Sequence, residues 1–208
     1  MDLTIVKGVN ETAYDPQKHH IISNASCTTN SLAPVMKVLD EHFGVENAMI
    51  TTTHAFTSTQ VTVDKRAKKR RRGRAASVNI IPTTTGAAVA TVEVLPQLEG
   101  KMEAMALRVP VPDGAITEVV ALLNKEVNVD EVNGVFEAAS HNELNGILEF
   151  TTDEIVSTDI LGNLHSSIID GLSTSVVGGR MVKVMAWYDN EYGYSQRLLD
   201  VADYMAAQ

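Results

Sequence analysis

The sequence SNASCTTNS, residues Ser23–Ser31, contains the only cysteine of the 208-residue chain. It lies between the apolar pair Ile21-Ile22 and the segment Leu32–Phe43, in which apolar residues recur every three or four positions, as in an amphipathic helix. A thiol at the start of a helix is close to unpaired backbone N–H groups and to the positive end of the helix dipole, which favour the thiolate. The stretch therefore predicts that Cys27 is a nucleophile. The alternative is a small buried hydrophobe, although the flanking Ser and Thr residues favour a polar pocket.

The composition describes a chain that can bury a sizeable core, with 44% hydrophobic residues and a formal net charge of −9. A single cysteine excludes an internal disulfide and a Cys-x-x-Cys metal site, so we expect a reducing, cytoplasmic setting and no metal. The chain has no apolar run long enough to cross a membrane and no charged-then-apolar leader, so we expect no membrane partner.

Positive charge is concentrated in one segment, because eight of the 17 basic residues lie between Lys65 and Arg74. The rest of the chain carries nine basic residues against all 26 acidic ones, which is not the charge pattern of a general nucleic-acid surface. The segment itself could attract the phosphates of a nucleic acid. The alternative is a solvated loop, which is favoured because no aromatic residue interrupts the basic run.

Several segments have the residue pattern of strands that bury one face. They include Met102–Val109 and Ala115–Leu123, and a third strand, Asn47–His54, ends on a histidine. Short turns join many of the strands, which predicts an α+β fold with a mixed, mostly antiparallel sheet and helices packed on one of its faces. No Gly-x-Gly-x-x-Gly sequence occurs, so the chain has no dinucleotide-binding fingerprint of its own.

Three further predictions concern individual elements. Thr4–Val9 is rich in β-forming residues and is predicted as a strand. Thr83–Gly86 is predicted as a turn that caps a helix over Ala87–Val94. Asp130–Ala139 is predicted as a helix with Asp130 near its N-cap.

A nucleophilic Cys27 needs a base, and His54 is the best placed of the six histidines. It ends a predicted strand where a long loop begins, which is a usual place for a catalytic group. A neutral imidazole beside a thiol can take its proton and form a thiolate–imidazolium pair. The spacing alone leaves open the alternative of a hydrogen-bonded structural histidine.

Several residues have the chemistry of a phosphate site. Ser26 and Thr28 present hydroxyl groups at a predicted helix N-terminus, which is itself a site for anions. Thr85 and Gly86 offer a hydroxyl and an approachable backbone N–H before the next helix. Arg72, at the end of the basic segment, can fork onto phosphate oxygens.

Arg108 is a stronger candidate for phosphate binding than Arg72. It lies in the predicted strand Met102–Val109, which is otherwise nearly free of charge, so its guanidinium needs an anionic partner. The partner can be a phosphate, or it can be an Asp or Glu of this chain in an internal ion pair.

Five motifs, in this order, resemble those of phosphorylating glyceraldehyde-3-phosphate dehydrogenases. They are SNASCTTN around Cys27, TTTHAFTSTQ around His54, RRRGRAASVNIIPTTTGAA, LRVPVP at Arg108 and WYDNEYGYSQR near the end. From about Thr4 onward the chain resembles the catalytic, C-terminal domain of that family, and the N-terminal nucleotide-binding half is absent. Residues 1–25 resemble the last strands of that half, residues 26–189 the catalytic domain, and residues 190–208 the helix that packs on the missing half.

The resemblance implies that the Cys27 thiol attacks glyceraldehyde 3-phosphate, that oxidation gives a thioester, and that inorganic phosphate releases an acyl phosphate. It implies that His54 is the base, and that Thr57 and Arg108 bind the phosphate of the substrate. The implied pocket for the attacking phosphate contains Ser26, Thr28, Arg72, Thr85 and Gly86. Asn190 is implied to orient the nicotinamide of NAD or NADP, with Tyr194 packed nearby, and the basic segment leaves the choice between the two cofactors open.

The resemblance also bears on partners. The family's loop over residues 57–74 borders the cofactor pocket of a neighbouring subunit in a tetramer, so we expect a homo-oligomer and no nucleic-acid partner. Without the nucleotide-binding half, we expect the isolated chain not to turn over NAD, and a separate nucleotide-binding half is one partner to test. The alternative is a non-enzymatic interaction or oligomerisation module, in which an uncovered apolar helix face drives association.

Overall fold

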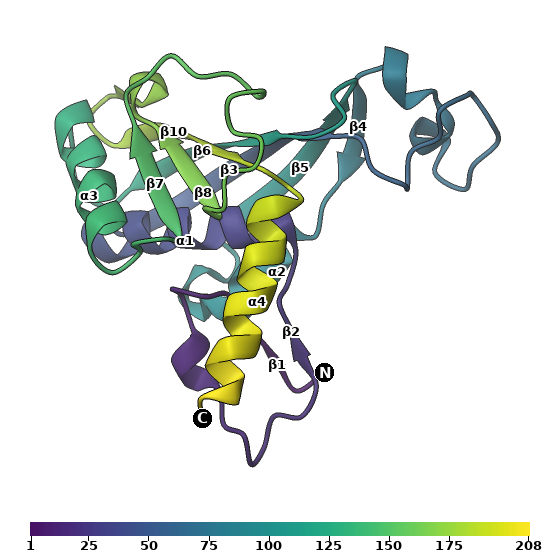
Figure 1. The fold of residues 1–208 in the computed structure, drawn as a ribbon. Helices are drawn as coiled ribbons and strands as arrows, with labels where there is room; N and C mark the ends of the chain where they lie inside the picture. The colour runs from purple at the N-terminus through teal and green to yellow at the C-terminus, as the bar shows by residue number, and fades with distance from the viewer.

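The core of the fold is one eight-stranded sheet. Its strands are β3 (Val45–Ala55), β4 (Ile81–Thr84), β5 (Met102–Val109), β6 (Ala115–Leu123), β7 (Leu148–Thr151), β8 (Ser167–Asp170), β9 (Ser175–Val177) and β10 (Met181–Tyr188). They lie in the order β4-β5-β3-β6-β10-β8-β7, and β9 also pairs with β10. Only β3–β5 and β7–β8 are parallel pairs. The computed structural model, which describes residues 1–208 (Figure 1), thus confirms the α+β fold with a mixed, mostly antiparallel sheet.

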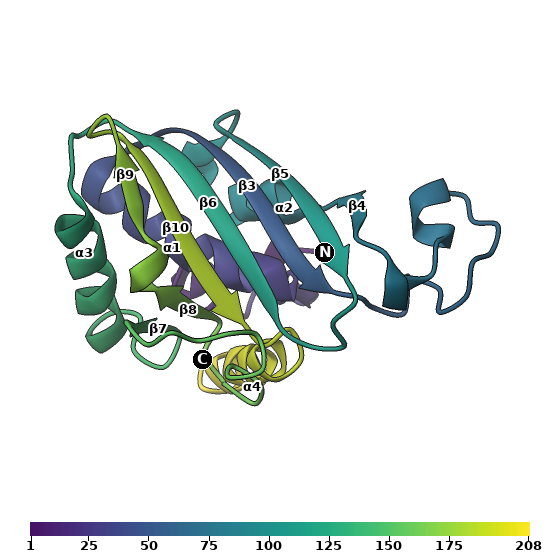
Figure 2. The ribbon, with the colours of Figure 1, turned by 90° about the horizontal axis from the view of Figure 1, so that it is seen from above.

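Three helices cover one face of this sheet, as predicted: α1 (Cys27–Phe43), α2 (Ala87–Val94) and α3 (Val129–His141). Figure 2 shows the broad strands β5, β3, β6 and β10 in front, with α1 and α2 behind them. The apolar stripe of α1, including Leu32, Met36 and Leu39, is fully buried and belongs to the same core cluster as Val119 of β6 and Val184 of β10. No helix covers the opposite face of the sheet (Figure 2), which carries exposed methionines.

The strand β6 shows how the sequence determines this layering. Its burial alternates along the whole strand, with one set of side chains buried and the intervening set partly exposed. Because successive strand residues point to opposite faces, the buried set packs under the helices. The uncovered face carries Met49, Met105 and Met181, which are exposed.

The strand predicted over Thr4–Val9 is much shorter in the structure, where β1 covers Leu3–Thr4. The chain then turns: the Val6 amide donates to Asn10 Oδ1 at 2.9 Å, and Gly8 has a φ of 82°. A backbone amide bonded to a local side chain is not available to a sheet, and left-handed glycine ends an extended segment.

One other predicted boundary is wrong, and one is refined. Thr83 and Thr84, expected in a turn, end β4, whose antiparallel register with β5 pairs Thr84 with Met105. Asp130 lies near the N-cap of α3, as predicted, and the N-cap itself is Asn128, which forms a reciprocal capping box with Glu131.

A second, smaller layer lies below α1 in Figure 1. There β1 pairs in parallel with β2 (Ile22–Ser23), and α4 (Tyr192–Ala206) extends beside them. The buried Arg197 holds α4 to the body, because it donates to the Gly146 carbonyl at 2.7 Å, and Asp200 of the same helix pairs with it at 2.7 Å. None of the four helices has the length and apolar composition needed to cross a bilayer. The division at residues 25/26 and 189/190 stays a prediction.

Candidate active site

Cys27 is the first residue of α1, and Ser26 is its N-cap. Ser26 Oγ accepts a hydrogen bond from the Thr29 amide at 3.1 Å, which satisfies one of the unpaired donors at the helix start. The helix therefore begins five residues earlier than its apolar periodicity indicates. The thiol lies at the helix N-terminus, as expected, and it is partly buried.

The electrostatics of the thiol differ from the sequence-based expectation. Burial raises the pKa of Cys27 above its ordinary value, and this outweighs the opposing effects of the Thr28 hydroxyl, the Thr28 amide and the charge of Arg108. Removing a thiolate from water is unfavourable, and one helix terminus does not compensate for it here. In the free chain the thiol is therefore the dominant form at neutral pH.

His54 lies near the end of β3 and faces the thiol. Its Nε2 atom is 3.5 Å from Cys27 Sγ, and the imidazole is 3% exposed. Burial, followed by the positive charge of Arg108, lowers the pKa of His54 to about 4. The imidazole is therefore neutral at pH 7, which is the state that a general base requires.

The other ring nitrogen of His54 has two competing partners. His54 Nδ1 is 2.8 Å from the Ala55 carbonyl oxygen and 2.7 Å from Arg108 Nη1. A proton on Nδ1 bonds to the carbonyl and leaves Nε2 free to accept the thiol proton, whereas a bare Nδ1 accepts from Arg108 and places the proton on Nε2. The position of the Arg108 side chain thus bears directly on whether His54 can act as a base toward Cys27.

Arg108 has no carboxylate partner among residues 1–208, so the alternative of an internal ion pair with Asp or Glu is not what the structure contains. Its Nη1 atom donates to the Ala55 carbonyl at 2.9 Å, and its Nε atom is buried without a hydrogen-bond partner. A buried guanidinium with an unused donor is unfavourable in the free chain and well suited to an anion.

A cavity of about 430 Å³ brings together nine of the eleven predicted site residues. They are Ser26, Cys27, Thr28, His54, Thr57, Arg72, Thr85, Gly86 and Arg108. Arg72 is oriented by Thr83, whose Oγ1 accepts from Arg72 Nε at 3.0 Å. A Cβ at Gly86 would meet no atom within 4 Å, so the backbone there borders open space that an oxyanion can approach. Two arginines, several hydroxyls and an open backbone give the cavity the donors that phosphate needs.

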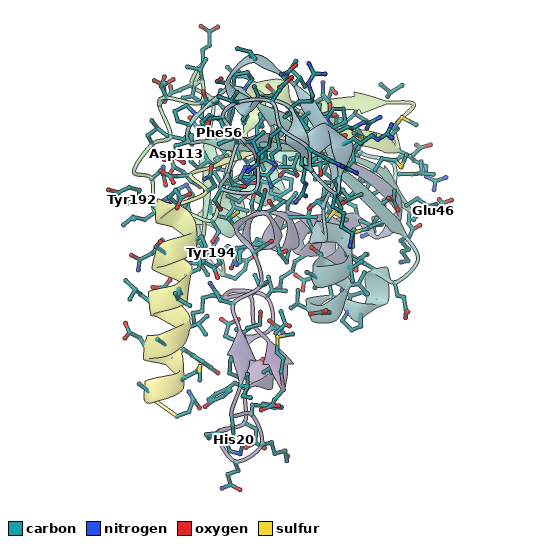
Figure 3. The ribbon with its side chains drawn as sticks, turned by 90° about the vertical axis from the view of Figure 1, so that its right-hand side faces the viewer. His20, Glu46, Phe56, Asp113, Tyr192 and Tyr194 are labelled. Atoms are coloured by element: carbon teal, nitrogen blue, oxygen red, sulfur yellow. The ribbon has the colours of Figure 1, made fainter.

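Asn190 and Tyr194 lie outside this cavity. Asn190 Oδ1 accepts from the Gly114 amide at 3.1 Å, and its Nδ2 donates to Glu191 Oε1 at 3.2 Å. Oδ1 retains one lone pair and Nδ2 retains one N–H, so the Asn190 carboxamide is complementary to the amide of a nicotinamide. Figure 3 shows Tyr194 in the first turn of α4, with Tyr192 at the start of the helix. Asn190 thus retains the donor and the acceptor that the amide of a nicotinamide requires.

Two residues of the site are missing from the sequence-based prediction. Tyr188 ends β10 and is 1% exposed; its hydroxyl is 2.9 Å from Thr28 Oγ1, and its ring meets the His54 ring edge-on at 5.9 Å. The other is Thr83, which orients Arg72. The alternating burial of β10 includes Tyr188, but its contacts with Thr28 and His54 join residues distant in sequence.

The basic segment lies outside the body of the molecule. Figure 1 shows the chain between β3 and β4 extending away from the sheet. The base of this loop is held by Asp64, which pairs with Arg74 at 2.9 Å and accepts from the Ala75 amide at 2.6 Å. Only Arg72 of the eight basic residues lines the cavity that contains Cys27.

Comparisons with known proteins agree on the family. The family model described as "Glyceraldehyde 3-phosphate dehydrogenase, C-terminal domain" matches residues 26–190. The chain is 54% identical over 207 residues to a glyceraldehyde-3-phosphate dehydrogenase of Geobacillus stearothermophilus, covering 100% of this chain and 62% of that protein. It is also 54% identical over 201 residues to the Haloarcula vallismortis protein of the same name, covering 97% of this chain and 59% of that protein. The chain thus spans about three fifths of the length of these relatives.

Proposed function

Because the chain belongs to the family of glyceraldehyde 3-phosphate dehydrogenase C-terminal domains, we propose that it is the catalytic domain of a phosphorylating aldehyde dehydrogenase. The proposed substrate is glyceraldehyde 3-phosphate, and the proposed product is an acyl phosphate. One observation supports this most directly: Cys27 Sγ lies 3.5 Å from His54 Nε2 in a cavity that also contains Arg72 and Arg108.

Cys27 is the nucleophile in this proposal. Its sulfur forms a bond to the aldehyde carbon as the thiol proton passes to His54 Nε2. His54 then gives that proton to the former carbonyl oxygen, which leaves a hemithioacetal and a neutral imidazole. This needs the tautomer in which His54 Nδ1–H bonds to the Ala55 carbonyl. His54 then takes the hydroxyl proton of the hemithioacetal as its carbon is oxidised to a thioester. A bound NAD or NADP supplies the hydride acceptor for this oxidation, and Asn190 and Tyr194 would hold its nicotinamide.

Phosphate groups have two proposed positions. Thr57 and Arg108 bind the phosphate that the substrate carries, and this uses the Arg108 Nε donor that has no partner in the free chain. Ser26, Thr28, Arg72, Thr85 and Gly86 bind inorganic phosphate beside the thioester. An oxygen of that phosphate forms a bond to the acyl carbon and the C–S bond breaks. Cys27 returns to the thiol by taking the proton that His54 received in the oxidation step.

The remaining parts of the chain have a proposed role in assembly. We propose that β1, β2 and α4, in residues 1–25 and 190–208, pack on a nucleotide-binding part, and that the working enzyme is a homo-oligomer. An exposed apolar strip on α4, formed by Leu198 and Leu199, is consistent with such packing. The same strip favours the second candidate, a non-enzymatic module that associates through this surface.

Two measurements test the proposed function. Iodoacetamide should label Cys27 in the unsubstituted chain, and His54→Ala should slow the labelling. Aldehyde oxidation, followed as NADH formation, should appear only when a separately produced nucleotide-binding half is added to the 208-residue chain. Equal labelling with and without His54 would contradict the paired chemistry, and NADH formation at normal rates by the chain alone would contradict the proposed need for a second half.

A further inference from the structure

Ala25 is the only residue other than glycine that has a positive φ, at 55°. The left-handed conformation is unfavourable for an L-residue with a Cβ atom, and it persists only where the surroundings hold it. Ala25 lies between β2 and α1, two residues before Cys27. Its conformation therefore sets the direction in which the chain enters the helix that carries the thiol.

The Asn30 side chain is hydrogen-bonded to the backbone on both sides of this turn. Its Nδ2 atom donates to the Asn24 carbonyl at 2.7 Å and to the Ser26 carbonyl at 3.0 Å, on either side of Ala25. Both N–H groups of the amide are used, and the reversed amide would place its oxygen against two carbonyl oxygens. Asn30 is 1% exposed, so water is not available to replace these bonds.

Asparagine is unfavourable inside a helix because its side chain competes for backbone groups. Asn30 is three residues beyond Cys27, in the first turn of α1. Its side chain bonds to carbonyls at the helix start and in the segment before it, where they fix the entry of the chain. The residue type thus suits a tie between the helix and the turn at Ala25.

We propose that Asn30 is a positioning residue for the nucleophile. By holding the Asn24 and Ser26 carbonyls, it keeps Ala25 left-handed and places Cys27 Sγ within reach of His54 Nε2. Asn30 acts on Cys27 through the backbone carbonyls to which its side chain donates. The inference rests on the proposed function, because it takes Cys27 and His54 as a working pair.

The test measures how strongly His54 influences the reactivity of Cys27. Iodoacetamide alkylation is specific, because Cys27 is the only thiol in the chain. His54→Ala is made in the unsubstituted chain and in an Asn30→Ala chain, and the two changes in rate and pH profile are compared as a double-mutant cycle. In the Asn30→Ala chain we expect the effect of His54→Ala to be roughly tenfold smaller, because releasing an alanine from left-handed backbone shifts its conformations by about that factor.

Asn133 provides a matched control. It is also a helical asparagine whose Nδ2 donates to a carbonyl, that of Gly171 at 3.0 Å, and whose Oδ1 has no partner, as in Asn30. It lies in α3 and does not line the cavity that contains Cys27. Asn133→Ala should weaken the fold while leaving the effect of His54→Ala unchanged.

A second substitution separates positioning from stability. Adding Ala25→Gly to the Asn30→Ala chain should restore the effect of His54, because glycine adopts the left-handed conformation without steric penalty. If circular dichroism shows that Asn30→Ala does not fold, the effect of His54→Ala is measured in an Ala25→Val chain instead. It leaves Asn30 in place and disfavours the same conformation, so it should reduce the effect of His54 equally.

The outcomes are distinct. An undiminished effect of His54 in the Asn30→Ala and Ala25→Val chains overturns the positioning role and leaves the proposed function standing. An equal loss in the Asn133→Ala chain, or no recovery with Ala25→Gly, also overturns it, because general destabilisation would then be the cause. If His54→Ala has no effect even in the unsubstituted chain, both the pair and its positioning residue are wrong.

Discussion

Arg108 and His54 are opposite each other in the register of the parallel pair β5–β3, and Arg108 Nη1 lies 2.7 Å from His54 Nδ1. One guanidinium therefore lies between a candidate substrate phosphate and the candidate base. A phosphate that drew Arg108 toward itself would leave His54 Nδ1 to the Ala55 carbonyl, and this favours the tautomer in which Nε2 accepts a proton. The geometry links binding of the anion to the state of the base.

The first prediction concerns the charge on this pair. Replacing Arg108 by Gln should raise the pKa of His54 from about 4, because the positive charge of Arg108 is one cause of its depression. The pKa should stay below 6.5, because burial is the larger cause and persists. Proton NMR of the His54 ring across a pH titration measures it. Arg180→Gln, at an exposed ion pair with Glu46, is the control and should leave the titration unchanged.

The second prediction concerns acid stability. The pKa of His54 is about 4 in the folded chain against 6.5 ordinarily, so the unfolded chain binds more protons between these values. The contribution of His54 to stability is fully present above pH 6.5 and is lost as the pH falls through about 4, and it amounts to about 3 kcal/mol. Urea unfolding should show a shallower loss between pH 7 and pH 4 in His54→Gln than in the unsubstituted chain. If the free energy of unfolding fell equally with pH in the two chains, this account would be contradicted.

The third prediction concerns Tyr188. Its hydroxyl bonds to Thr28 Oγ1 at 2.9 Å in a fully buried setting. Tyr188→Phe leaves the Thr28 hydroxyl without this partner and should lower the free energy of unfolding by about 1–2 kcal/mol. Tyr192→Phe, at a residue that is 59% exposed, should change it by less than about 0.5 kcal/mol. Equal effects in urea denaturation would show that the buried contact is unimportant.

The fourth prediction concerns the orientation of Arg72. Thr83→Val keeps the shape of the side chain but removes the oxygen that accepts from Arg72 Nε. Because such a bond contributes about 1 kcal/mol, the affinity for inorganic phosphate should fall by roughly fivefold in calorimetric titration. Thr62→Val, at an exposed residue of the same loop, should bind phosphate as the unsubstituted chain does. A matching loss in that control would point to the loop as a whole.

The fifth prediction separates the two candidate functions. Leu198 and Leu199 are 51% and 61% exposed on α4, so replacing both by Lys should change the free energy of unfolding by only about 0.5–1 kcal/mol. Sedimentation should show less self-association, since a charged strip cannot be buried against an apolar one. Labelling of Cys27 should continue at its original rate. If labelling falls together with association, the surface and the thiol are not independent.

Local pattern accounts for much of the fold. The limits of β5 and β6 coincide with the predicted segments Met102–Val109 and Ala115–Leu123, because burial imposes a regular pattern on each strand. The apolar period of α1 begins only at Leu32, since the first turn is held by the Ser26 cap, and the start at Cys27 was indicated instead by the polar residues expected at a helix N-terminus. Residue chemistry indicated most of the site, and the family motifs added Thr57, Asn190 and Tyr194. They could not give the contact of Tyr188 with Thr28, because that depends on how distant strands and helices meet.

The connection between β3 and β5 has a consequence for how the chain folds. A parallel pair cannot be closed by a tight turn, and here residues 56–101, which include Arg72, Thr85 and Gly86, form the crossover. Ordering so long a connection, which contains β4 and α2, costs entropy before the contacts between β3 and β5 compensate for it. We expect substitutions in the crossover to show φ-values near zero in refolding experiments, against higher values for α1 with β6. A newly made chain would then bury the part of the core between α1 and β6 before it has a cavity around its thiol.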